Sequence, residues 1–167
     1  MDLLSDASAT VEAQLVVLRE LVDTFQLHSV YSALCPLVVS RRMTANTFHR
    51  LIDTVAAQAM WKGGSSLLAA PLLHSPTDGK TFAHYPRQTE LVWAAVQAAS
   101  GYFVEVEVSM RGIGFVPEPF ASPRLVRDTT YAFNFVGANP GRWRVWAVDA
   151  SGRPSVPSAW GTFRYTQ

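Results

Sequence analysis

The stretch NPGRWRVWAVDASG, from Asn139 to Gly152, decides the fold because it packs two arginines and two tryptophans into five consecutive positions. Grooves for single-stranded nucleic acid also interleave basic and aromatic residues. A β-strand offers a second explanation, since its successive side chains point to opposite faces of a sheet. As a strand, the stretch has an apolar face with Trp143, Val145 and Ala147, and an opposite face with Arg142, Arg144 and Trp146.

Composition places the chain among globular proteins with unusually little charge. Of its 167 residues, 49% are hydrophobic and 16% are charged, whereas roughly 25% is usual for a soluble domain. A chain this apolar often covers part of its surface with a partner. The formal net charge of +1 argues against a protein whose main role is to bind polyanions.

A single cysteine, Cys35, excludes a disulfide within the chain and a CxxC metal site. The opening residues MDLLSDASATVE lack the basic region of a signal peptide, so we expect a reducing, cytoplasmic setting. The longest stretch without Asp, Glu, Lys or Arg runs from Thr24 to Ser40 and falls short of the ~20 apolar residues of a membrane-spanning helix. No transmembrane segment is expected.

The first part of the chain has the periodicity of helices. Apolar residues recur at three- and four-residue spacing over 11–25 and again over 44–60. Thr44 is the expected N-cap of the second of these helices. Between them, over 28–42, the sequence predicts a shorter helix that is interrupted near Pro36.

The pattern changes after WKGGSS, whose glycines and serines are expected to stop the helix and form a hinge. Turn signals about every ten residues then suggest an antiparallel sandwich. Strands are expected near 72–75, 89–96, 102–109, 130–136, 142–148 and 162–165. The proline-rich region Arg111–Arg124 is expected to be an irregular edge or a long crossing loop. The chain thus divides into a helical docking region (1–62), a hinge (63–70) and a β-sandwich (71–167).

Five pieces of the second region together resemble a fibronectin type III module of the bacterial kind. They are SPTDGKTF (Ser75–Phe82), LVW with Trp93, GYFVEVEV (Gly101–Val108), TTYAFNF (Thr129–Phe135) and PGRWRVWAVDASGRPSVPSAW (Pro140–Trp160). The resemblance covers about residues 71–166 and implies an immunoglobulin-like β-sandwich that binds or spaces proteins. It departs from the family at Trp143, where a tyrosine is usual. The helical region resembles no family that we can name, and the expected fold class is α+β.

The resemblance also makes the strands near 102–109 and 142–148 antiparallel neighbours in one sheet. Glu105 and Glu107 then lie opposite Arg142 and Arg144 as a solvated cross-strand charge ladder. Exposed pairs of this kind add roughly 0–1 kcal/mol each. Because the glutamates neutralise the arginines, no nucleic-acid binding is expected.

Two candidate contact surfaces remain. Phe103 and Trp146 lie beside the charges on the outer face of the sheet, and exposed aromatics next to arginine favour protein–protein contact. Alternatively, loops or the helical region cover these two aromatics. The second surface is a basic cluster in the helical region, which either contacts an anionic membrane or a large partner or is a short solvated loop. Its arginines are Arg41, Arg42 and Arg50.

No complete catalytic motif is present. Cys35 with His28 or His49 would be a thiol–imidazole pair, but we expect Cys35 to be a small buried hydrophobe. The histidine spacing fits no metal site, and Glu105 with Glu107 fits a ladder better than a pair of catalytic carboxylates. We therefore expect no catalytic residue, no cofactor and no metal.

The sequence thus favours a non-enzymatic accessory or scaffold subunit that contacts other proteins of a multi-subunit assembly, with peripheral membrane contact as one option. Two alternatives stay open. One is a carbohydrate- or peptide-binding module that uses Trp146, Trp160 and the region Arg111–Arg124. The other is an enzyme whose site lies in the helices around Cys35 and His49.

Overall fold

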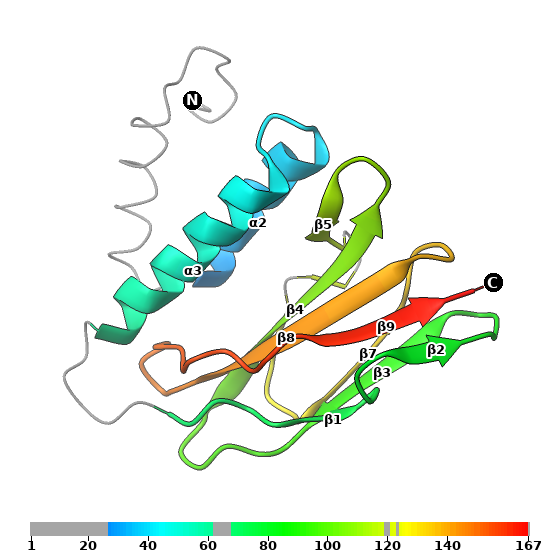
Figure 1. Ribbon diagram of the computed structural model, residues 1–167. Helices are drawn as coiled ribbons and strands as arrows, with labels where there is room; N and C mark the ends of the chain where they lie inside the picture. Colours follow the sequence, from blue (N-terminus) through cyan, green and yellow to red (C-terminus); the bar gives the residue numbers. More distant parts are fainter. Residues whose placement is uncertain (1–26, 62–67, 119–120, 123, 167) are drawn as a thin grey trace.

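A helical hairpin and two β-sheets form three layers in the computed structural model, which describes residues 27–61, 68–118, 121–122 and 124–166 (Figure 1). The helices are α2 (Leu27–Val39) and α3 (Ala45–Trp61). The strands are β1 (Leu73–Ser75), β2 (Lys80–Phe82), β3 (Gln88–Trp93), β4 (Gly101–Met110), β5 (Gly114–Pro117), β6 (Arg124–Val126), β7 (Thr130–Asn134), β8 (Pro140–Val148) and β9 (Gly161–Tyr165). The α+β fold class is confirmed, with helices preceding the sandwich in the chain.

Helix α3 matches its prediction, including its N-cap. The backbone N–H of Thr47 donates to Oγ1 of Thr44 over 3.2 Å, which satisfies one of the free donors at the helix start. The predicted interruption of α2 at Pro36 is wrong, because the helix continues through the proline to Val39. A proline inside a helix removes one hydrogen bond and crowds the preceding turn, but buried Leu37 and Val38 hold the last turn against the core.

The helix predicted over 11–25 lies outside the described residues. Within the described part of the chain, no helix has both the length and the hydropathy to cross a bilayer.

The strands form a small and a large sheet that face each other. The small sheet has the order β1-β3-β7, and the large one has the order β2-β9-β8-β4-β5, with β6 also paired to β4. All these pairs are antiparallel except β2 with β9, which are parallel. The chain therefore changes sheets between β1 and β2, and β1 remains an edge strand.

All six strands expected from the sequence are present, and three short ones were missed. The expectation of an irregular edge or a long crossing loop over Arg111–Arg124 is wrong in part, because this region contains β5, a regular strand at the edge of the large sheet, and the start of β6. Gly112 and Gly114 have φ values of +77° and +95°, which favour glycine. They let the chain turn directly from β4 into β5, so Met110 pairs with Gly114.

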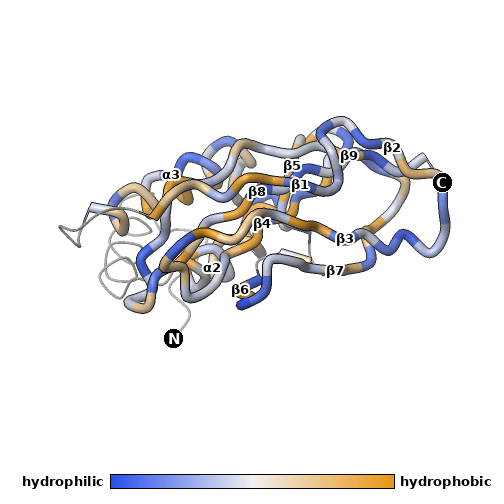
Figure 2. Tube along the Cα trace, turned by 90° about the horizontal axis from the view of Figure 1, so that it is seen from below, coloured by the Kyte–Doolittle hydropathy of each residue, from blue (hydrophilic) through white to orange (hydrophobic). Residues whose placement is uncertain are grey.

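Aromatic side chains fill the space between the two sheets. Trp93 packs against Tyr102 and Trp143, with ring centroids 5.4 and 6.3 Å apart. These rings belong to β3, β4 and β8, and Figure 2 shows hydrophobic residues along β3 and β4 in the middle of the molecule. The predicted inward face of the Arg142–Val148 strand is confirmed, since Trp143, Val145 and Ala147 are all fully buried.

A second aromatic cluster joins the helices to the opposite face of the large sheet. Tyr31 of α2 packs against Phe48 of α3 and Phe103 of β4, with centroid distances of 5.0 and 5.7 Å. Phe103 in turn lies 5.3 Å from Trp146 of β8. Helices and sandwich therefore share one continuous hydrophobic core. Residues 63–67 of the predicted hinge lie outside the described residues, and the proposed domain boundaries stay a prediction.

Substituting Phe48 tests this packing. Phe48→Ala removes a fully buried ring and should lower the free energy of unfolding by about 3–5 kcal/mol. Trp61→Ala, also on α3 but 82% exposed, should change it by less than about 0.5 kcal/mol. Urea denaturation of both variants measures the difference, and a small effect of Phe48→Ala would show that α3 does not pack on the sheet.

Candidate functional site

The outer face of β4 and β8 brings together the residues that the sequence marked as a contact surface. The register pairs Phe103 with Trp146, Glu105 with Arg144, and Glu107 with Arg142. Both predicted charge pairs are therefore confirmed as direct cross-strand neighbours.

The expectation that this ladder is solvated is wrong. Glu105 and Glu107 are 0% exposed, and Phe103 and Trp146 are also buried. The physical reason is that the α2–α3 hairpin lies over this face, so the apolar side chains of both helices cover the aromatics. Of the two alternatives for Phe103 and Trp146, the structure shows the second: the chain's own helical region covers them.

Glu107 is held between the sheet and α3. Nε of Arg142 donates to its Oε2 over 2.5 Å, and Nε2 of His49 lies 2.5 Å from its Oε1. Both carboxylate oxygens thus have a partner, one from β8 and one from the helix. This arrangement offsets the cost of removing the carboxylate from water.

Arg144 makes the second link between the sheet and α3. Its Nε donates to Oε2 of Glu105 over 2.6 Å, and its Nη2 donates to Oδ1 of Asp53 over 2.8 Å. The Trp160 ring lies beside the guanidinium groups of both Arg144 and Arg142, at centroid distances of 4.4 and 4.0 Å. Stacking on an aromatic ring suits the planar guanidinium and shields the pairs from solvent.

We call these six side chains the interface charge network. Its members are Glu105, Glu107, Arg142, Arg144, His49 and Asp53. When every carboxylate is ionised and the histidine is neutral, three negative charges face two positive ones.

The pKa of Glu105 is set mainly by burial. Burial raises the pKa to about 7, Arg144 opposes the rise, and Glu107 adds to it. Burial, followed by the charges of Glu105 and Glu107, also raises the pKa of the Cys35 thiol to about 12. A thiol with so high a pKa is a poor nucleophile at neutral pH.

The remaining predicted site residues lie elsewhere. Arg41, Arg42 and Arg50 are exposed at the α2–α3 turn and the start of α3, apart from the network. In the described part of the chain, no three His, Cys, Asp or Glu side chains come together in a way that could hold a metal ion.

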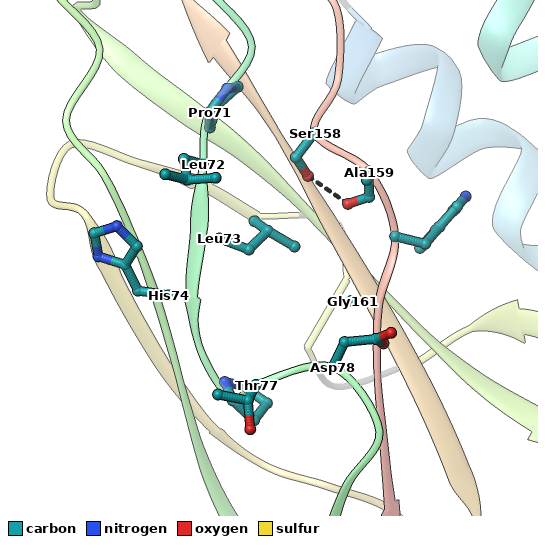
Figure 3. Close-up of a pocket in the computed structure, with 11 residues that line it drawn as sticks. Pro71, Leu72, Leu73, His74, Thr77, Asp78, Ser158, Ala159 and Gly161 are labelled. Atoms are coloured by element: carbon teal, nitrogen blue, oxygen red, sulfur yellow. Dashed lines mark hydrogen bonds between the residues drawn. The ribbon is translucent and has the colours of Figure 1, made fainter.

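A groove that sequence reasoning missed runs beside the edge strand β1 (Figure 3). It has a volume of about 410 Å³ and lies between residues 71–78 and 158–161. Leu72 and Leu73 line one side, and Ser158 and Ala159 line the other. Only the assembled fold brings these two segments together, so no local sequence signal could have found the groove.

The aromatic platform of the carbohydrate-binding alternative is not formed. Trp146 is fully buried, Trp160 contacts the two arginines, and Arg111 lies in the β4–β5 turn rather than beside them. The expectation that Trp146 contacts a ligand is wrong in this structure, because α2 and α3 cover it together with Phe103.

Comparison with solved structures finds fibronectin type III proteins among those that part of this chain resembles. The chain resembles a Fn3-like protein from Clostridium thermocellum at 20% identity, covering 61% of this chain and 97% of that one, with a TM-score of 0.43. It also resembles the fn3 domain of the human collagen alpha-1(XX) chain, at 15% identity over 64% and 93% of the two chains, with a TM-score of 0.45. A β-1,2-glucanase from Parabacteroides distasonis matches at 21% identity over 62% of this chain and 14% of the enzyme, with a TM-score of 0.41. No family model and no curated protein matches the sequence.

The strand order of the two sheets indicates the type of sandwich. The β1-β3-β7 sheet packs against a sheet in which β9, β8 and β4 are neighbours, as in immunoglobulin-like sandwiches. The sandwich is fibronectin type III-like. The helical hairpin is an addition that covers one face of this sandwich.

Arg144 offers a test of the network. Arg144→Met keeps an apolar stem but leaves Glu105 without its arginine, and should cost about 3 kcal/mol of stability or more. The other partner of Arg144 is Asp53, and the Asp53 side chain is 56% exposed. Asp53→Asn removes its charge and should lower the free energy of unfolding by less than about 1 kcal/mol. Chemical denaturation of both variants measures the two losses, and equal losses would contradict the network as described.

Glu105 should also make stability depend on pH. The folded chain keeps a proton on Glu105 up to about pH 7, whereas the unfolded chain loses it near 4.5. The resulting stabilisation is complete below the unfolded value and is lost as the pH rises through the folded one. The difference in Tm between the wild type and Glu105→Gln should therefore fall from about pH 5 to about pH 8. Glu90→Gln, on exposed Glu90, controls for loss of a carboxylate, and a difference for Glu105→Gln that does not fall would contradict the assignment.

Proposed function

We propose that this chain is a non-enzymatic scaffold subunit that holds protein neighbours together within a larger cytoplasmic assembly. Fibronectin type III-like sandwiches are commonly protein-interaction or scaffold modules. The lone cysteine is consistent with a reducing compartment. The added helices give the sandwich a third layer, so it presents more surface than the sandwich alone.

The observation that carries the proposal is the large apolar side chain of Leu72, which is 66% exposed beside the groove. Edge strand β1, which follows it, pairs with a strand on one side only. A sheet edge presents unpaired backbone groups that another chain can pair with, and an apolar side chain beside it adds contact area for such a partner.

The absence of catalysis is supported by the way the ionisable groups are placed. The glutamates of the interface charge network are sealed under α3, and each has an arginine partner. The raised pKa of Cys35 argues against a thiol–imidazole pair with His49. A substrate would therefore have to displace the helices before it reached these groups.

The groove also favours peptide binding as a second candidate function. An extended segment of a partner can pair with a free strand edge while its side chains enter neighbouring pockets. Such a segment would lie between β1 and residues 158–161, with apolar side chains against Leu72 and Leu73.

Site-specific cross-linking tests both candidates. A photoreactive amino acid would replace Leu72 in the tagged full chain, and a control chain would carry it at exposed Arg164 on β9. We expect a discrete cross-linked partner at position 72, a weaker one at position 164, and elution of the chain from native extract as part of a complex. A cross-link to an extended partner segment would favour the peptide-binding role.

A chain that elutes as a monomer and gives the same cross-linking at both positions would contradict the scaffold proposal.

A further inference from the structure

The α2–α3 turn and the β4–β5 turn lie at the same end of the molecule (Figure 1), where α2 contacts β5. This end carries exposed arginines from three elements. We call it the basic end and define it by Arg41, Arg42, Arg50 and Arg111. Among the described residues, none of these four arginines has an acidic partner within ion-pair distance.

The charge of the described residues is concentrated at this end. They include twelve Lys or Arg and eight Asp or Glu. The excess of positive over negative charge is therefore four, which equals the four arginines of the basic end. The rest of the described structure has equal numbers of positive and negative side chains. A cluster of this kind produces a local positive potential even though the chain as a whole is close to neutral.

The backbone at Arg41 gives independent support for a role of the charge. The N–H of Arg42 donates to the carbonyl of Leu37 over 2.9 Å, and the N–H of Arg41 donates to that of Val38 over 3.1 Å. These bonds form a Schellman motif, whose left-handed position is normally occupied by glycine. Here Arg41 occupies it with φ of 60°, a conformation that is unfavourable for a side chain with a Cβ. The chain thus has an arginine where glycine would suit the fold better.

The shape of the basic end suits a flat partner better than a strand of nucleic acid. Two separate turns present the arginines, and neither turn (residues 40–44 and 111–113) contains an aromatic residue on which a base could stack. Val39, which precedes the first turn, is 46% exposed. Arginines beside an exposed apolar side chain fit the interface of an anionic bilayer, where headgroup phosphates meet acyl chains.

We propose that the basic end docks the protein on an anionic membrane surface. The arginines bind lipid phosphates, and Val39 inserts at the level of the headgroups. This inference extends the proposed scaffold role by placing the assembly at a membrane. Cross-linking at Leu72 tests the protein contacts separately, so either proposal can fail without the other.

Co-sedimentation of the full chain with vesicles tests the docking. Vesicles that contain phosphatidylglycerol should bind the protein, pure phosphatidylcholine vesicles should not, and added salt should weaken binding. Each arginine near the surface contributes about fivefold in affinity, so the double variant Arg41→Gly with Arg42→Ser should lose about 25-fold.

Two controls keep the result interpretable. The double variant Arg127→Ser with Arg164→Ser removes two exposed arginines outside the basic end and should retain most of the binding. The single variant Arg41→Gly should keep or raise Tm while it weakens binding, which separates loss of charge from loss of fold.

Three results would overturn the proposal. The first is no binding to anionic vesicles, and the second is an equal loss in the two double variants, which would mean that only overall charge matters. The third is tighter binding to a polyglutamate peptide than to vesicles, which would assign the basic end to an acidic protein.

Discussion

Two hydrogen-bonded carboxyl–guanidinium pairs, Glu105 with Arg144 and Glu107 with Arg142, lie between a sheet and a helix, with both carboxyl groups fully buried. Buried charges are costly unless every polar atom around them is paired. Helix α3 adds His49 as a partner of Glu107 and Asp53 as a partner of Arg144, whereas Oε1 of Glu105 is buried without a hydrogen-bond partner among the described residues. His49 and Asp53 are four positions apart and thus lie on one side of the helix. A shift of α3 along or around its axis would separate them from their partners, so the charges fix how the hairpin sits.

This constraint determines which surfaces remain for partners. The helices close the outer face of the large sheet, on which a solvated fibronectin type III-like module could otherwise form contacts. Among the surfaces of the described residues that stay open are the edge at β1, with its groove and Leu72, and the basic end, where α2, α3 and the β4–β5 turn meet. The helical hairpin therefore has two roles: it covers one face of the sandwich and creates a positively charged end.

Much of the sandwich could be predicted from the sequence because period-two alternation is local. The alternation assigned Trp143 and Val145 to the core, and the family resemblance placed Glu105 opposite Arg144. The burial of that ladder could not be predicted, since it depends on where α3 packs, and helical periodicity shows only that a helix has an apolar side. Phe103 and Trp146 on the charged face were a partial signal, because two large aromatics beside charges need a cover. The groove and the paired turns of the basic end arise only when distant segments meet.

The hairpin and the sandwich are expected to unfold as one cooperative unit, joined by the interface charge network. Hydrogen exchange of backbone amides under native conditions measures this most directly, because it gives the free energy of opening for each element. We expect the amides of Ile52 and Val55 in α3 to open with the same free energy as those of Val104 in β4 and Val145 in β8. Exchange in α3 that is much faster than in the two strands would mean that the helices open independently, and would contradict this expectation.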